Sequence, residues 1–339
     1  MVIYLKKFKI SKIYYEPEVS KYDLGKKLLK KYSSVPQIQI QSHNNIPELR
    51  EYSNKDFVKL KTYLILGVRK SLRWVPNNKI SDYLVPFTSS GCMAMCLYCY
   101  LVCNYNKCSY LRVFVNREEI MDNIVKKVNK ADTDLVLEIG SNSDLILEET
   151  ITSNLSWTIK EFVSRTPKGK LTFPTKFCMV DSILNLDHQG RIIPRMSINP
   201  KSIIKTIELG TSNLDERIEA INKLADAGYP VGILIAPVIF VDNWKKLYKD
   251  LVIYLNKKLS EKAKEVIFFE VIFMTYSFIH NAINTEAFPN SPVLMNKELM
   301  KSRGKGKYTY KNELKAEGTL YISSLLKKHF KDNEIKYIV

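Results

Sequence analysis

Three closely spaced cysteines carry the clearest chemistry of the chain. Cys92, Cys96 and Cys99 form a C-x3-C-x2-C array that follows a short apolar run and a Ser/Gly loop. Cysteine thiolates ligate iron–sulfur clusters, and a [4Fe–4S] cluster has four iron atoms to ligate. Because the loop supplies three thiols, the fourth iron would be open to a small molecule. The alternatives are a zinc site or buried thiols, although zinc takes four ligands and no second Cys or His pair accompanies the array.

An open iron suits S-adenosylmethionine (SAM), whose amino and carboxylate groups can chelate it. One electron from the cluster could then cleave a C–S bond to give methionine and a 5′-deoxyadenosyl radical, a radical cofactor chemistry. The spacing, with the aromatic Tyr98 between the last two cysteines, resembles the signature of the radical SAM superfamily. This resemblance implies a [4Fe–4S] cluster and SAM as cofactors.

The elements that must position this loop form a regular series. Apolar runs of about six residues alternate with helical patterns from residue 83 onward, which is typical of βα units and a parallel sheet. We expect strands over residues 84–87, 135–140, 171–177, 194–199, 231–240 and 266–274, and helices beginning near residues 117, 152, 180, 201 or 213, and 243. The fold class is therefore α/β, a partial (βα)6 TIM-like barrel with its chemistry at the carboxyl ends of the strands.

Two extensions are expected to flank the barrel. Residues 1–78 predict an N-terminal α+β extension, with a basic helix over residues 23–31 and a strand over residues 63–68. Residues 79–275 hold the barrel of the radical SAM type. Residues 276–339 predict a C-terminal extension with a β-hairpin and a helix.

Polar residues follow the expected strand ends, as a barrel active site requires. Ser141 and Ser143 follow the second strand, Lys176 lies at the end of the third, and Ser197 lies at the end of the fourth. Serines there are also ordinary turn formers and helix caps. Lys176 is harder to explain in that way, because it lies among phenylalanines, should be partly desolvated, and then needs an anion.

The amino-acid composition favours a polyanionic partner. The chain has 52 Lys+Arg against 35 Asp+Glu, a net charge of +17, which favours nucleic acid, although an AT-rich genome also raises the lysine count. The longest apolar run, residues 229–241, is too short to cross a membrane. Its N-terminus is unlike a signal peptide, so the six cysteines predict a reducing cytoplasm.

Six collinear blocks between residues 63 and 339 resemble the spore photoproduct lyase family of radical SAM DNA repair enzymes. The blocks are SGCMAMCLYCYL, EIGSNSD, FPTKF, RMSINP, AGYPVGILIAPV and GKGKYTY. The resemblance implies that the protein splits a methylene-bridged thymine dimer in double-stranded DNA through the adenosyl radical. It also implies a flavodoxin- or ferredoxin-type reductant and a monomer.

The family implies roles for individual residues. By resemblance, Cys92, Cys96 and Cys99 bind the cluster, Tyr98 lies beside the adenine, Ser143, Lys176, Ser197 and the backbone at Ala236 contact SAM, and Tyr100 relays hydrogen.

Two positions depart from the family pattern. Ser141 stands where many members have the cysteine that returns hydrogen to the product radical, and an O–H bond is too strong to replace S–H in that step. Cys103 is then a candidate donor, with Cys108 and Cys178 as further thiols, unless these cysteines are simply buried or incidental. Residues 274–275 are Met-Thr where members tend to have His-Arg. The alternatives are a divergent radical SAM enzyme with another nucleic-acid substrate, or a DNA-binding iron–sulfur protein without turnover.

The segment 297–310 is the expected DNA contact. A lesion within stacked bases must be extruded before chemistry can reach it. The segment supplies the cations Arg303, Lys305 and Lys307 for phosphates and Tyr308 as a wedge or stacking surface, with glycines that fit a hairpin tip. The alternative is an ordinary solvated hairpin.

Overall fold

The computed structural model describes residues 9–103 and 110–339, except for the side chain of Cys103. Its larger sheet has eight strands in the order β18-β14-β13-β11-β10-β9-β5-β4. These strands are β4 (Val75–Pro76), β5 (Tyr83–Leu84), β9 (Val136–Glu138), β10 (Lys170–Thr175), β11 (Ile192–Ile198), β13 (Val231–Val238), β14 (Ile267–Phe273) and β18 (Ile335–Ile338). The six strands from β5 to β14 are parallel neighbours in chain order, so the expected partial (βα)6 barrel is confirmed.

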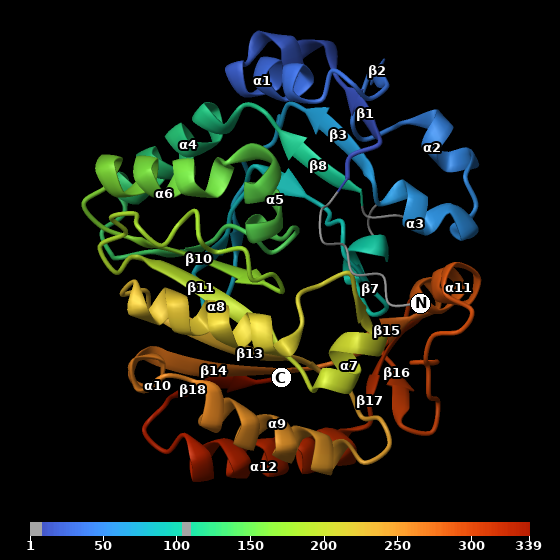
Figure 1. The fold of residues 1–339 in the computed structure, drawn as a ribbon, viewed down its shortest axis with the longest axis vertical. Coiled ribbons are helices and arrows are strands. Elements are labelled where there is room, and N and C mark those ends of the chain that lie inside the picture. The colour runs from blue at the N-terminus through green and yellow to red at the C-terminus, as the bar shows by residue number, and fades with distance from the viewer. Residues whose placement is uncertain (1–8, 104–109) are drawn as a thin grey trace.

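Helices cover the sheet and both extensions (Figure 1). They are α1 (Asp23–Lys31), α2 (Pro47–Glu51), α3 (Phe57–Leu60), α4 (Arg117–Lys130), α5 (Leu145–Thr152), α6 (Asn154–Arg165), α7 (Lys201–Thr206), α8 (Leu214–Asp226), α9 (Trp244–Lys258), α10 (Glu261–Val266), α11 (Phe278–Ala287) and α12 (Asn312–His329), with short 3-10 turns η1 (Pro17–Lys21), η2 (Asn54–Asp56) and η3 (Tyr100–Cys103). None of the helices in the described ranges is long and apolar enough to cross a membrane.

Helix α8 shows how local sequence sets these elements. Asn213 Oδ1 accepts a hydrogen bond from the Glu216 amide at 3.0 Å, and the Glu216 carboxylate accepts one from the Asn213 amide at 2.8 Å. This reciprocal capping box satisfies two donors that the first helical turn would leave unpaired. At the other end, Gly228 adopts a φ of 86°, which suits a residue without a side chain.

One charged cluster lies inside the barrel. The Arg195 guanidinium on β11 is buried between the carboxylates of Glu138 on β9 and Glu270 on β14, at 2.8 and 3.0 Å. Gly232 on β13 makes room for it, because a Cβ atom there would lie 2.7 Å from Cγ of Arg195. The ion pairs join three strands across the barrel interior.

A second sheet, of five strands, lies above the barrel in Figure 1, in the order β2-β1-β3-β8-β6. It consists of β1 (Lys12–Tyr15), β2 (Gln37–Gln39), β3 (Tyr63–Gly67), β6 (Ser89–Ser90) and β8 (Leu111–Phe114). The basic helix and the strand expected in this region are α1 and β3. Since β3 pairs with β8, backbone hydrogen bonds cross the expected boundary at residue 78. The division of the chain into three parts stays a prediction.

Glu16 ties the end of β1 to its neighbours. Its carboxylate accepts hydrogen bonds from the His43 ring at 2.8 Å, the His43 amide at 2.9 Å and the Val68 amide at 2.9 Å. Burial alone would raise the pKa of this carboxyl, but the three hydrogen bonds outweigh burial and lower it to about 2.

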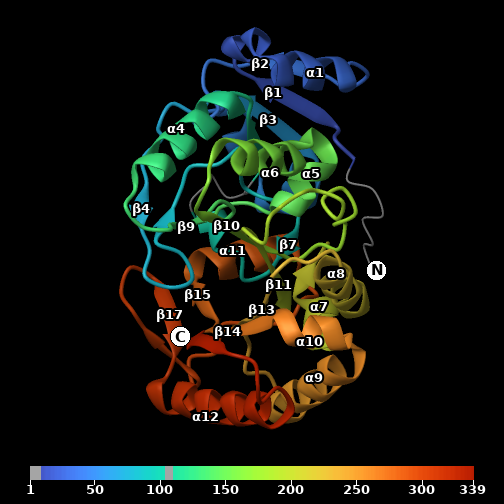
Figure 2. The same ribbon diagram turned by 90° about the vertical axis from the view of Figure 1, so that its left-hand side faces the viewer.

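The C-terminal extension contains the expected hairpin and helix. Strands β15 (Thr275–Ser277), β16 (Met300–Ser302) and β17 (Lys307–Tyr310) form an antiparallel sheet in the order β15-β17-β16. Figure 2 shows α9 and α12 at the end of the molecule opposite α1. Beyond α12 the chain returns as β18, which pairs in parallel with β14.

Two helix expectations need correction. Residues 181–186 form turns, since Ile183 and Leu186 donate to carbonyls three residues back and no α-helical bonding develops. The helix expected near residue 152 is α6, which begins at Asn154, and α5 before it was not predicted.

Candidate active site

The cysteine loop is held on several sides. Strand β7 (Met95–Cys96) pairs antiparallel with β12 (Glu208–Leu209), and the Leu97 amide donates to the Ile207 carbonyl at 2.9 Å. Lys61 Nζ donates to the Cys92 carbonyl at 2.7 Å. The loop therefore has a fixed backbone around its three thiols.

The three thiols share one electrostatic environment. Burial raises the pKa of Cys92 to about 12 and raises that of Cys96 further, while Lys176 opposes the shift at Cys96. The neighbouring Cys99 and Cys92 thiols add to the upward shift of the Cys96 pKa, and all three cysteines are partly buried. Within the described ranges, no three His, Cys, Asp or Glu side chains already converge as a metal site. The donor set itself, three free thiols on one loop with a lysine beside them, fits a cluster held by three cysteines.

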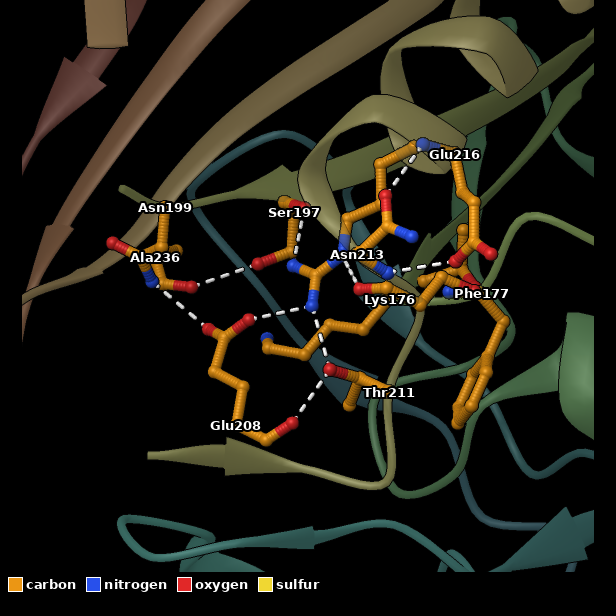
Figure 3. A network of polar contacts seen from close by, with 12 residues as sticks. Lys176, Phe177, Ser197, Asn199, Glu208, Thr211, Asn213, Glu216 and Ala236 are labelled. Atoms are coloured by element: carbon orange, nitrogen blue, oxygen red, sulfur yellow. Dashed lines mark hydrogen bonds and ion pairs between the residues drawn. The ribbon is translucent and has the colours of Figure 1, made fainter. Parts of the chain in front are cut away.

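A buried ion pair lies under the loop. Glu208 and Arg217 have fully buried side chains, and Glu208 Oε2 lies 2.7 Å from Arg217 Nη2. The Tyr98 hydroxyl donates to Glu208. Figure 3 shows the Asn199 side chain, whose Nδ2 donates to the same carboxylate at 2.9 Å. The pair thus fixes the hydroxyl end of the aromatic residue between the last two cysteines.

This ion pair was not predicted from the sequence, although the sequence carries a signal for it. In α8 the buried apolar positions 214, 218, 221, 224 and 225 form one stripe, and Arg217 lies within that stripe. A charged residue at such a position either needs a buried partner or disrupts the helix packing.

Lys176 lies where an anion could reach it. Its backbone amide donates to Asp144 at 2.9 Å, and its Nζ lies 5.7 Å from the centre of the Tyr98 ring. In the described part of the chain, Nζ makes no hydrogen bond or ion pair. The ammonium is therefore available at the carboxyl end of β10, next to Cys96.

The other expected SAM contacts lie on neighbouring elements. Ser197 on β11 donates through Oγ to the Ala236 carbonyl on β13 at 2.8 Å, which brings these two residues together. Ser143 Oγ accepts from Ser89 at 2.7 Å, and Ser143 bridges Gly91 directly before the cysteine loop.

The family model described as "Spore photoproduct lyase" matches residues 8–339. The chain belongs to the spore photoproduct lyase family. A curated relative named spore photoproduct lyase from Bacillus subtilis (strain 168) is 32% identical and covers 96% of this chain and 97% of its own length. Another from Geobacillus sp. (strain Y412MC61) is 29% identical and covers 98% of this chain and 99% of its own length.

Solved structures of spore photoproduct lyase have the same fold. A double variant with bound AdoMet and dinucleoside spore photoproduct superimposes with a TM-score of 0.91 at 28% identity, covering 98% of this chain and all of the other. A spore photoproduct lyase complexed with dinucleoside spore photoproduct also gives 0.91 at 28% identity, with the same coverage. The fold expected from the family is confirmed.

The positions that depart from the spore photoproduct lyase pattern can be placed in part. The Tyr100 hydroxyl donates to the Ser141 carbonyl, which brings these two expected residues together. Cys103 ends η3, but its side chain lies outside the described residues, as does all of Cys108. Cys178 is partly buried two residues after Lys176.

Helix α11 supports the loop at the expected lesion side. Met274 and His280 are both buried. The His280 ring forms a hydrogen bond between Nδ1 and Ser277 Oγ at 2.8 Å. Burial lowers the pKa of His280. A hydrogen bond to the Cys99 backbone acts in the opposite direction but is the smaller effect. Asn284 donates to the Leu97 carbonyl at 2.7 Å, so α11 is joined to the cysteine loop. Neither α11 nor these contacts were predicted from the sequence.

The hairpin presents its cations to solvent. Arg303, Lys305 and Lys307 are exposed, and the tip adopts positive φ at Gly304, Lys305 and Gly306. The Tyr308 ring packs edge-on against Phe278, with centroids 5.2 Å apart. Phe278 is 50% exposed and adds an aromatic surface that was not predicted from the sequence.

Proposed function

We propose that this protein is a radical SAM DNA repair lyase that splits spore photoproduct, a methylene-bridged thymine dimer, back into two thymines. Membership of the family supports this, as does the fold shared with a spore photoproduct lyase that binds AdoMet and the dinucleoside lesion. The observation that carries the proposal is that one fixed loop carries three free thiols and Tyr98, and that the Lys176 ammonium, at the carboxyl end of β10, lies 5.7 Å from the centre of the Tyr98 ring.

Cys92, Cys96 and Cys99 would hold the [4Fe–4S] cluster. When bound, the cluster and SAM supply the radical that takes hydrogen from the saturated thymine ring. Lys176 would neutralise the SAM carboxylate, since its ammonium makes no ion pair at contact distance in the described part of the chain.

Other residues would position SAM. Ser143, Ser197 and the Ala236 backbone border the same strand ends as Lys176. Tyr98 is held by Glu208, so its ring has a fixed orientation beside the cluster loop and can lie against the adenine.

The return of hydrogen to the product must use another group than Ser141. Its O–H bond is much stronger than a thiol S–H bond, so the serine cannot act as the donor. Tyr100, which is half exposed and hydrogen-bonded to the Ser141 backbone, would relay hydrogen. Cys103 is our candidate for its thiol source, with Cys178 as the second candidate.

Double-stranded DNA carrying the lesion would bind at the hairpin. Arg303, Lys305 and Lys307 would contact phosphates, while Tyr308 and Phe278 would fill the space left by the extruded dimer. We further infer a flavodoxin- or ferredoxin-type reductant, action as a monomer on a single lesion, and a cytoplasmic location where the cysteines stay reduced.

Anaerobic reconstitution with iron and sulfide, followed by a repair assay on a synthetic thymine dimer, tests the proposal. We expect SAM cleavage on reduction and release of two thymines, with Cys103→Ala and Cys178→Ala assayed beside the parent to locate the donor. SAM cleavage without repair would instead indicate a divergent radical SAM enzyme. Absence of SAM cleavage from a cluster-loaded sample would indicate a DNA-binding iron–sulfur protein.

A further inference from the structure

A polar cavity of about 290 Å³ lies at the carboxyl ends of the strands of the N-terminal sheet. It is separate from the residues placed at the SAM site. Apart from the Phe114 ring, its wall is made of charged and polar residues. They lie in β6 and β8 and in the chain segments that follow β1, β2 and β3; those used below are Glu16, Arg69, Lys70, Ser90 and Arg112. A volume of this size is near the lower end of ligand pockets, roughly 300–1,000 Å³.

Two buried donors meet on one wall of the cavity. Ser90 and Arg112 are directly opposite each other in the β6–β8 pair, so their side chains leave the sheet on the same face. Ser90 is 2% exposed and Arg112 is 8% exposed. Ser90 Oγ has no hydrogen-bond partner among the described residues, which is costly for a buried hydroxyl that lines a cavity.

The adjacent Ser89 has a different environment. It lies on the other face of β6, where its hydroxyl donates to Ser143 and to Glu148. Because successive residues of a strand alternate faces, Ser90 points away from the SAM side of the strand. The unsatisfied hydroxyl therefore belongs to the cavity and is not a spare donor of the active site.

The charge balance in the cavity favours an anion. Arg69, Lys70 and Arg112 contribute three positive charges, against the single carboxylate of Glu16. Both oxygens of Glu16 already accept hydrogen bonds, from the His43 ring and amide and from the Val68 amide. Lys70 is exposed at the rim and makes no ion pair with any described residue.

We propose that this cavity binds a phosphate group, with Ser90 and Arg112 as buried donors and Arg69 and Lys70 as the cationic rim. Guanidinium groups match the oxygens of phosphate in charge and geometry, and hydrogen bonds to a charged group are the stronger kind. The phosphate belongs either to a small phosphorylated molecule or to a DNA terminus or backbone. The site does not depend on the lyase activity.

Calorimetric titration of the anaerobically reconstituted protein with inorganic phosphate and with ribose 5-phosphate tests the site, with saturating SAM present to occupy the active site. We expect one site per chain. Ser90→Ala should weaken binding by roughly tenfold or more, because it removes a donor to a charged group. It should leave the urea midpoint unchanged or higher, because the hydroxyl has no partner among the described residues.

Lys70→Met should also weaken binding and reduce its salt dependence. Lys21 is an exposed lysine outside the cavity, so Lys21→Met should leave binding unchanged.

Adding a lesion-free duplex distinguishes the two sources of phosphate. Simultaneous binding assigns the site to a small molecule, and competition assigns it to DNA. No binding of either probe at millimolar concentration, or unchanged affinity in both the Ser90 and Lys70 variants, would overturn the proposal.

Discussion

Replacing Arg217 by methionine should destabilise the protein by about 3–5 kcal/mol, because it leaves a buried carboxylate without its ion-pair partner. The Glu208 and Arg217 side chains are both fully buried and lie 2.7 Å apart. The guanidinium also donates to the Ser197 and Ser212 carbonyls, each at 2.9 Å, and to Thr211 Oγ1 at 2.7 Å. The substitution therefore removes one ion pair and leaves several acceptors unpaired in the interior.

Urea unfolding followed by tryptophan fluorescence gives the measurement. With an m-value of about 3 kcal/mol per molar urea, a loss of about 4 kcal/mol lowers the midpoint by roughly 1.3 M. Arg165→Met is the matched control, since Arg165 pairs with Asp122 at the surface, with 36% and 64% of their side chains exposed. Such a surface pair is worth about 0–1 kcal/mol.

A double variant isolates the charge. Glu208→Gln combined with Arg217→Met removes the orphaned carboxylate and should recover part of the lost stability. If Arg217→Met were no more harmful than Arg165→Met, or if the double variant were no more stable than Arg217→Met alone, the reasoning about the buried pair would be refuted.

Three further outcomes are expected. Lys176→Met should weaken SAM binding by roughly 10- to 100-fold in equilibrium dialysis, since it would remove the proposed charge-assisted contact to the SAM carboxylate. Glu16→Gln should cost about 3 kcal/mol at neutral pH, because the pKa of Glu16 is lowered from 4.5 to about 2 on folding. That stability is present above pH 4.5 and is lost as pH falls towards 2, so urea unfolding should show the two proteins converging in acid. Lys305→Glu with Lys307→Glu should weaken filter binding of all DNA sequences alike and lower the salt slope by about 2.

Each outcome has its own control. Lys170→Met, at the exposed start of β10, should keep parental SAM affinity, and equal losses in both lysine variants would contradict the role of Lys176. A gap between Glu16→Gln and the parent that does not change with pH would show that the carboxylate charge is irrelevant. Lys126→Glu with Lys130→Glu, on exposed positions of α4, makes the same charge change away from the hairpin. Unchanged DNA affinity in the hairpin variant would exclude it as a contact.

Much of the barrel could be predicted because its signals are local. Each parallel strand is a short apolar run, and α8 carries its own cap in Asn213 and its own stop in Gly228. The hairpin tip was predictable for the same reason, since Gly304 and Gly306 adopt the positive φ that a tight turn needs. In these places the residues that determine the conformation are adjacent in the chain.

Other elements depend on partners distant in sequence. Strand β18 has only four residues, and the two in its middle, Lys336 and Tyr337, are polar. It is a strand because it pairs with the edge of β14, about 65 residues earlier in the chain. Strand β6 has only two serines, and it is defined by its pairing with β8. Conversely, residues 181–186 satisfy a helical pattern but bond as successive turns. Local sequence propensity predicts secondary structure poorly where pairing with a distant strand determines the conformation.

The side chains that support the candidate active site were also hard to predict from sequence, because their partners are distant in the chain. The cysteine spacing and Lys176 stand out in the sequence alone, whereas the other SAM contacts are expected from the resemblance to the family. The sequence indicates no partner for Arg217, although a cation on the apolar stripe of α8 requires one, and that partner, Glu208, lies on the strand that pairs with the cysteine loop. Since Glu208 also accepts the Tyr98 hydroxyl, a charge on a helix outside the barrel sets the position of an aromatic ring within the loop. A charged residue on an otherwise apolar helix face is therefore a useful sign that a second layer supports the site, and its partner has to come from the fold.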